Sequence, residues 1–234
     1  SLDNGEDQHL VLQELIHGDK LVGGADMSFR MLVRIASLVV AYPNQVHPLL
    51  ANHELSQLTR RGITKGHGNI VEMFEAGVVW AFGEESDGVF QAIDRFFLAM
   101  PLAVKSTSGL MCCHSLPNAE VMDVFDKNIF SRSLTDEDRE WSSGSASLLV
   151  WGRLYNEEQV ELLSNEWEVK LFCLGHAFVP DGAEVAMPKV ILLNSDNEQG
   201  AVLPIDLSNI QDAETTLWSA IKLASLSIEP DDGS

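Results

Sequence analysis

Three short apolar stretches in this 234-residue sequence each lead into a side chain that can bind a metal ion. These side chains belong to Asn52-His53-Glu54, to His114 and to Gly175-His176. A single histidine after a strand is more often a packed core residue, but the shared placement of three favours a common site. Strands of α/β sheets deliver ligands from their carboxyl ends, so three such ends can converge. Imidazole nitrogen and amide oxygen together suit Mn, Fe or Zn better than Ca or Mg.

The elements that must position these residues alternate between helices and apolar strands, which is typical of a layered α/β domain. Apolar residues spaced near 3.6 predict helices at residues 27–41, 69–82, 89–100, 156–167 and 213–226, and one beginning between 54 and 60. Short apolar runs predict strands at residues 46–50, 102–105, 110–113, 148–151, 169–174, 189–193 and 201–205. Residues 10–16 fit one helical face, although the alternation of Leu10 and Leu12 leaves a strand open.

The charge of the chain excludes several classes of partner. Fifteen Lys and Arg stand against 35 Asp and Glu, which gives a formal net charge of −20. Nucleic acid and anionic membrane surfaces require clustered cations, so neither is an expected partner. The apolar stretches are also shorter than the roughly 20 residues of a membrane-spanning helix. Small phosphorylated substrates remain compatible, because a metal ion or one arginine can set the local field.

The three cysteines, Cys112, Cys113 and Cys173, lie in apolar runs and are odd in number. They are therefore interpreted as buried thiols, and a disulfide scaffold is excluded. This usage and the lack of a recognisable signal peptide predict a cytoplasmic protein.

The ordered motifs resemble those of the calcineurin-like metallophosphoesterases, which include the serine/threonine protein phosphatases. Asn52-His53-Glu54 is similar to their GNHE motif, residues 113–117 (Cys-His-Ser-Leu-Pro) to their HGGLSP motif, and residues 175–178 (Gly-His-Ala-Phe) to their GHTP motif. The resemblance covers roughly residues 27–206.

This resemblance implies a β-sandwich flanked by helices, with two divalent metal ions (Mn, Fe or Zn) at the strand ends of the complete protein. Asn52, His114 and His176 would be metal ligands. His53 would be the general acid, oriented by Glu54, and it would protonate a poor alkoxide leaving group. The substrate would be a phosphomonoester on a small molecule or a phosphoprotein; the oligomeric state is left open.

An arginine is expected to bind the phosphate. Arg153 follows a Val-Trp-Gly run and resembles an arginine that holds the phosphate in several bacterial members. A guanidinium matches phosphate oxygens bidentately. Arg60 and Arg61 are weaker candidates, and a surface arginine in a turn is the alternative for Arg153.

Two earlier family motifs are missing or incomplete. Asp-x-His has no counterpart, and Gly18-Asp19 matches only the start of Gly-Asp-x-x-Asp, 33 residues before Asn52. Whether Asp19 is a ligand stays open. With Ser1 as the first residue, the expectation is an N-terminally incomplete phosphoesterase: a partial, irregular segment at 1–26, the domain at 27–227 and an acidic tail at 228–234. The alternative is a catalytically inactive relative that serves as a binding or scaffold domain.

Overall fold

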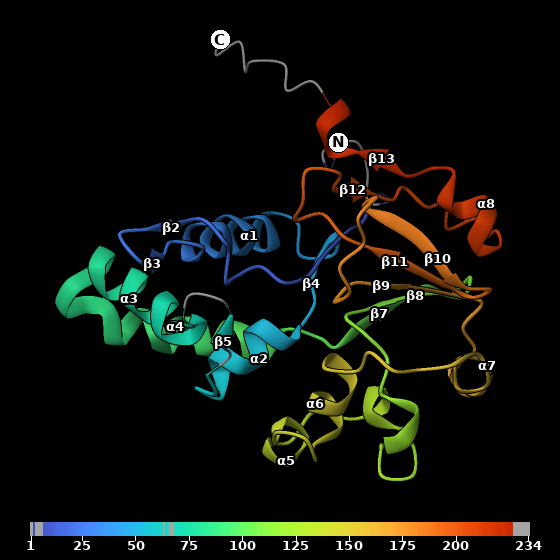
Figure 1. Ribbon diagram of the computed structural model, residues 1–234, viewed down its shortest axis with the longest axis horizontal. Coiled ribbons are helices and arrows are strands. Elements are labelled where there is room, and N and C mark those ends of the chain that lie inside the picture. The colour runs from blue at the N-terminus through green and yellow to red at the C-terminus, as the bar shows by residue number, and fades with distance from the viewer. Residues whose placement is uncertain (1, 3–6, 63, 66–67, 227–234) are drawn as a thin grey trace.

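A central five-stranded mixed sheet is the main element of the fold in Figure 1, which shows the computed structural model of the chain. The structure describes residues 2, 7–62, 64–65 and 68–226, so the expected acidic tail at 228–234 lies outside the described residues. The strand order is β10-β11-β9-β8-β7, with β8, β9 and β11 parallel and both edge strands antiparallel. The strands span Ala103–Lys105 (β7), Leu110–Cys113 (β8), Leu171–Leu174 (β9), Ala183–Met187 (β10) and Val190–Leu193 (β11).

The sheet is buried on both faces, which explains why its central strands read as unbroken apolar runs. Met111, Phe172 and Val190 belong to the main core, whereas Leu171 and Ile191 pack in a second cluster beneath the C-terminal helix. The mixed α/β architecture is therefore confirmed, with helices flanking a central mixed sheet.

The first strand decides between two alternatives that the sequence leaves open. Residues 10–16 do not form a helix: β1 (Leu10–Leu12) pairs in parallel with β4 (Val46–Pro48), and Leu12 is opposite Pro48. Residues 1–26, expected to be irregular, thus contain an ordered strand, because pairing with β4 supplies the backbone partners that the local sequence cannot. Three further two-stranded ribbons are β2 (Leu21–Val22) with β3 (Ala25–Asp26), β5 (Thr64–Lys65) with β6 (Gly68–Asn69), and β12 (Ala201–Val202) with β13 (Ile221–Lys222).

The helices of the first half follow their predicted periodicity. They lie together on the left of Figure 1, beside the β1–β4 pair.

The α-helices of the whole described chain are α1 (Phe29–Ala41), α2 (Asn52–Leu58), α3 (Ile70–Phe82), α4 (Ser86–Ala99), α5 (Asp136–Arg139), α6 (Ser145–Val150), α7 (Glu157–Glu166) and α8 (Ala213–Leu217). Short 3₁₀ turns are η2 (Gly83–Glu85), η3 (Ala119–Val121), η4 (Ile129–Ser131) and η5 (Leu223–Ser225). In the described part of the chain, none of the helices has the length and apolar character needed to cross a bilayer.

Two predictions for the second half are wrong in local detail, and one strand was missed. The expected strand at 148–151 lies in helix α6 and its end, because a short, fully buried apolar run has no period that separates strand from helix. The expected helix at 213–226 ends at Leu217, where the chain turns back to pair β13 with β12. Strand β10 was not predicted, since its side chains are only partly buried on one face.

Candidate metal centre

Four side chains from separate segments converge at the carboxyl ends of β1, β4, β8 and β9. His114 Nε2 lies 2.7 Å from Asn52 Oδ1, 3.1 Å from His176 Nδ1 and 3.6 Å from Glu14 Oε1. Donor atoms of Glu14, His114 and His176 all lie within 4.8 Å of one another. The structure thus brings together the three residues that the sequence analysis singled out as metal ligands, and it adds a carboxylate.

The register of the central sheet places the two histidines side by side. Cys113 at the end of β8 is opposite Leu174 at the end of β9, and the backbone N–H of Gly175 donates to the carbonyl of His114 at 3.1 Å. A Cβ on Gly175 would lie 2.5 Å from Gln13 Nε2, so a larger residue there would displace the Gln13 side chain that contacts His114. His176 itself has a φ of 62°, a left-handed conformation that costs energy in a non-glycine residue.

Both ring nitrogens of His114 face amide oxygens. Its Nδ1 is 2.6 Å from Gln13 Oε1 and its Nε2 is 2.7 Å from Asn52 Oδ1, so the one proton of a neutral ring can serve only one of the two contacts. With that proton on Nδ1, Nε2 presents a lone pair to the cluster. That lone pair faces an amide oxygen, a carboxylate oxygen and the ring nitrogen of His176. A proton on His176 Nδ1 can be donated to the lone pair of His114 Nε2. The contacts of this lone pair with Asn52 Oδ1 and Glu14 Oε1 then place two acceptors next to each other with no proton between them. A divalent cation would relieve this crowding, and the outer partner on Nδ1 is the arrangement typical of metal-binding histidines.

Burial keeps both histidines in the neutral form that binds metals. The pKa of His114 is well below its usual value, chiefly because of burial and then because of His176 and His53. Burial, followed by the charge of Arg153, lowers the pKa of His176 to about 3. The Nε2 of His176 is buried and has no hydrogen-bond partner among the described residues.

His53 and Glu54 follow Asn52 in the first turn of α2. His53 Nε2 lies 3.5 Å from Glu14 Oε1, and its ring centroid is 5.1 Å from that of His17. Glu54 is fully buried, and its Oε1 accepts a hydrogen bond of 2.6 Å from the backbone N–H of Leu15. Burial raises the pKa of Glu54 to about 7. Glu54 therefore anchors the segment after β1, and its orienting role toward His53 stays a prediction.

Arg153 lies beside the cluster. Its Nη1 donates to the carbonyl of His176 at 3.1 Å, and its backbone N–H donates to Asn118 Oδ1 at 2.7 Å. Gly152 allows this placement, because a Cβ there would overlap the carbonyl oxygen of Leu116.

The other two candidate arginines are engaged elsewhere. Arg60 is paired with Glu75 at 3.2 Å and with Asp94 at 3.0 Å. The Arg61 guanidinium lies 4.6 Å from the centroid of the Trp141 ring.

The carboxylate and the amide that follow β1 were missed from the sequence. The sequence leaves their segment, residues 10–16, open between a helix and a strand, and only the alternation of Leu10 and Leu12 indicates the strand that brings Gln13 and Glu14 to His114. Asp19 is exposed and does not belong to the Glu14–His114–His176 group. Within the described ranges this group is the one set of three or more carboxylate, histidine or cysteine donors close enough to share a cation.

Comparisons with solved structures identify protein phosphatases of similar fold. A Saccharomyces cerevisiae protein serine/threonine phosphatase, described as similar to human phosphatase PP5, matches with a TM-score of 0.55 and 13% identity, over 74% of this chain and 56% of that one. A cold-active protein-tyrosine phosphatase of a psychrophilic Shewanella species matches with a TM-score of 0.53 and 14% identity, over 83% of this chain and 63% of that one. The chain thus spans less than two thirds of either structure, and at this identity the likeness concerns the fold. No protein-family model and no curated protein sequence matches the chain.

Proposed function

We propose that this chain binds a divalent metal ion and hydrolyses phosphomonoesters at the centre around His114. The observation that carries the proposal is the approach of three donor atoms, from Glu14, Asn52 and His176, to within 3.6 Å of one histidine nitrogen. The fold shared with protein phosphatases supports it.

The donor set of Glu14, Asn52, His114 and His176 would hold the ion. Two imidazoles, an amide oxygen and a carboxylate suit Mn, Fe or Zn. When bound, such a cation polarises a phosphoryl oxygen and activates water as a nucleophile. The resemblance found in the sequence implies two cations, but the described residues offer one group of donors, so the proposal for this chain is limited to one.

Three residues of the chain would bind the phosphate, protonate the leaving group and orient the proton donor. Arg153 pairs its guanidinium with phosphoryl oxygens, which it matches in geometry. His53 donates a proton to the leaving oxygen as the ester P–O bond breaks and the bond to the attacking water oxygen forms. Glu14, 3.5 Å from His53 Nε2, orients that ring. A phosphoprotein is included among the proposed substrates because Arg153 is exposed at the surface.

The test compares two leaving groups. Phenyl phosphate releases a basic oxygen that needs a proton, whereas 4-nitrophenyl phosphate releases one that hardly does. With Mn²⁺ present, His53→Ala should lower turnover of phenyl phosphate by about 10²–10⁴-fold and that of 4-nitrophenyl phosphate far less. Mn²⁺ affinity, measured by calorimetry, should stay close to that of the unmodified chain. Equal losses on both esters, or a matching loss of Mn²⁺ affinity, would contradict the acid role of His53.

A second candidate is a phosphate-binding domain without turnover. It is favoured by the presence of a single carboxylate, Glu14, in the donor group. In that case Mn²⁺ and inorganic phosphate should bind together, Arg153→Met should abolish phosphate binding, and neither ester should be hydrolysed. His9→Ala is the matched control for both candidates, because His9 is exposed and stacks on His47.

A further inference from the structure

Two cysteines lie side by side on the central sheet, outside the candidate metal centre. Cys112 of β8 is directly opposite Cys173 of β9 in the parallel register, and both are free thiols. Residues opposite each other in neighbouring strands point to the same face of a sheet. Both side chains accordingly belong to the second apolar cluster, beneath α8. Their thiols are close enough to interact directly.

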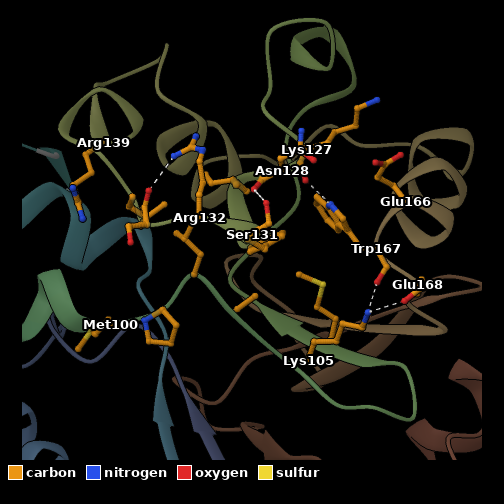
Figure 2. Close-up of a pocket in the computed structure, with 18 of the residues that line it drawn as sticks. Met100, Lys105, Lys127, Asn128, Ser131, Arg132, Arg139, Glu166, Trp167 and Glu168 are labelled. Carbon is orange, nitrogen blue, oxygen red and sulfur yellow. Dashed lines mark hydrogen bonds and ion pairs between the residues drawn. The ribbon is translucent and has the colours of Figure 1, made fainter.

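The third cysteine is separated from this pair by the sheet. Successive side chains of a strand point to opposite faces, so Cys113 lies on the other face from Cys112. Cys113 and Met111 belong to the main core, and Met111 also lines a cavity of about 740 Å³ on that face (Figure 2). The thiol of Cys113 is fully buried and donates to the carbonyl of Ser115 at 3.3 Å. Cys113 is therefore a structural thiol and a natural internal control for the pair.

Cys112 is the more accessible member of the pair. Its side chain is partly exposed, whereas Cys173 is only 8% exposed. A small oxidant therefore reaches Cys112 first, and Cys173 is the thiol on the same face that can react with the oxidised sulfur.

The spacing of the strands suits a disulfide between the two residues. Neighbouring strands are about 4.8 Å apart, which is inside the range of about 4.4–6.8 Å that separates the Cα atoms of a disulfide. The Cβ atoms of a disulfide are about 3.8 Å apart, so the bond should draw β8 and β9 together by up to about 1 Å at this level.

We propose that Cys112 and Cys173 form a redox-sensitive dithiol, which hydrogen peroxide or another hydroperoxide converts into a disulfide. The peroxide oxidises the Cys112 thiol to a sulfenic acid and is itself reduced, and one water leaves. The Cys173 thiol then attacks that sulfur, the S–S bond forms and a second water leaves. The two thiols together lose two electrons and two protons, and a dithiol reductant reverses the reaction.

The disulfide would also act on the candidate metal centre, a consequence that rests on the proposed function. His114 lies two residues after Cys112, and His176 lies three residues after Cys173. A site of this kind must hold its ligands to within about 0.5 Å of the productive geometry. A displacement of β8 toward β9 just before both histidines should therefore weaken metal binding.

The experiment treats the full chain with hydrogen peroxide, alkylates the remaining thiols and maps the peptides by mass spectrometry without reduction. Trypsin produces one fragment, residues 106–127, that contains Cys112 and Cys113, and another, residues 171–189, that contains Cys173. The two fragments should be found linked, with a mass lower by two hydrogens than their sum, and dithiothreitol should separate them. A bond between Cys112 and Cys113, a disulfide-linked dimer, or oxidation of Cys112 to a sulfinic acid without the linked peptide would overturn the proposal.

Variants assign the bond to one cysteine of the first fragment. Cys112→Ala should abolish the linked peptide, whereas the matched control Cys113→Ala should retain it; the opposite result would overturn the proposal. The peptide map of the unmodified chain does not depend on how well either variant folds, because tandem mass spectra of the linked peptide also identify the bonded cysteine.

A second measurement tests the effect on the candidate metal centre. After the peroxide is removed, Mn²⁺ affinity of the oxidised chain should be about tenfold lower than that of the reduced chain, the lower end of what the surroundings of metal ligands contribute. Dithiothreitol should restore the affinity, and the same treatment of Cys112→Ala should change it little. Equal affinities of the oxidised and reduced chains would overturn this consequence. A reduced chain that does not bind Mn²⁺ would instead contradict the proposed function, and the linked peptide would still decide whether the disulfide forms.

Discussion

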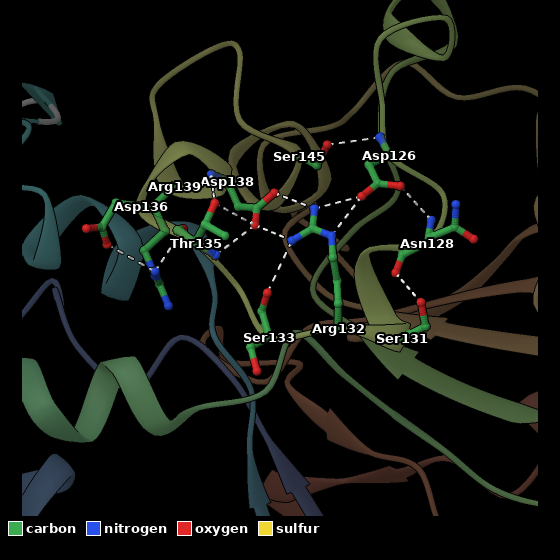
Figure 3. Close-up of polar contacts among 10 residues, drawn as sticks. All are labelled: Asp126, Asn128, Ser131, Arg132, Ser133, Thr135, Asp136, Asp138, Arg139 and Ser145. Atoms are coloured by element: carbon green, nitrogen blue, oxygen red, sulfur yellow. Dashed lines mark hydrogen bonds and ion pairs between the residues drawn. The ribbon is translucent and has the colours of Figure 1, made fainter.

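The cluster around His114 and the network around Arg132 both consist of polar side chains, but hydrogen-bond donors and acceptors are balanced only around Arg132. Around Arg132 (Figure 3), guanidinium donors meet the carboxylates of Asp126 and Asp138 at distances between 2.5 and 2.9 Å. Around His114, acceptor atoms of Glu14 and Asn52 face a nitrogen lone pair. The first region is complete without a ligand, whereas the second has an excess of acceptors that a cation would satisfy. We infer that the balance of donors and acceptors separates a structural network from a candidate binding site in this molecule.

The largest effect is expected from removing His114 Nε2, the nitrogen that the acceptor atoms of Asn52 and Glu14 face. His114→Ala should weaken Zn²⁺ or Mn²⁺ binding by more than about 100-fold, since even outer partners of metal ligands contribute 10- to 100-fold. Competition with a chromophoric chelator measures the affinity. The exposed His9→Ala should bind the ion as the unmodified chain does; an unchanged affinity of His114→Ala would instead show that the acceptor cluster is not a metal site.

A smaller effect is expected from the residue that fixes the proton of His114. Gln13→Ala removes the acceptor of the Nδ1 proton and should lower metal affinity by about 10- to 100-fold. The same chelator assay applies, with the exposed Gln211→Ala as the matched control. If Gln13→Ala binds the ion normally, then the lone pair of Nε2 is set by some other contact.

A substitution in the network around Arg132, in contrast, should lower the stability of the fold and leave metal affinity unchanged. Arg132→Met leaves the carboxylate of Asp138, only 7% exposed, without its strongest partner, so the thermal midpoint should fall by a few degrees at pH 7. Calorimetric unfolding measures this, and metal affinity should not change. A variant that loses metal binding as well would erase the distinction between the two regions.

The loss of thermal stability in Arg132→Met should depend on pH. Hydrogen bonding to Arg132 holds the pKa of Asp138 well below its usual value of 3.8. A lowered folded-state pKa stabilises the protein above the unfolded pKa, and this stability is lost as the carboxylate becomes protonated. The difference in thermal midpoint between the unmodified chain and Arg132→Met should therefore be full at neutral pH and shrink as the pH falls below about 4.

The smallest effect should come from the long ion pair between Glu168 and Lys105, at the end of strand β7. Glu168 is 89% exposed and lies 3.8 Å from Lys105 Nζ, so water screens the interaction. Glu168→Gln should leave the thermal midpoint unchanged within the error of calorimetry. A clear destabilisation would show that this pair is part of a matched network like that of Arg132.

The sequence allowed the ends of β4, β8 and β9 to be placed, because their apolar runs are followed at once by distinctive polar side chains. The parallel pairing of β8 with β9 brings His114 and His176 together. Asn52 follows β4, which pairs with β1 in a separate sheet, so its approach to His114 depends on the packing of the two sheets. The helices α1, α3 and α4 were likewise predictable from periodicity alone.

The missing parts depend on contacts between distant segments. Gln13 and Glu14 reach His114 only because β1 pairs with β4, and Gln13 is 101 residues away from His114 in the chain. Three residues of strand, Leu10–Leu12, carry too short a pattern to distinguish from a helical turn. The same limit applies to α6, whose buried residues show no polar face, and to β13, whose partner β12 fixes a conformation that the local sequence does not.

The spacing of the donor residues has a consequence for how the molecule folds. Asn52 and His114 are 62 residues apart, and His114 and His176 are separated by the same interval. Contacts over such separations form slowly, since the entropy of closing long loops must be overcome first. The candidate metal centre is therefore expected to be among the last parts of the chain to assemble, after the helices of the first half. The appearance of a metal-dependent signal during refolding would then mark the moment at which β1, β4, β8 and β9 have all found their places.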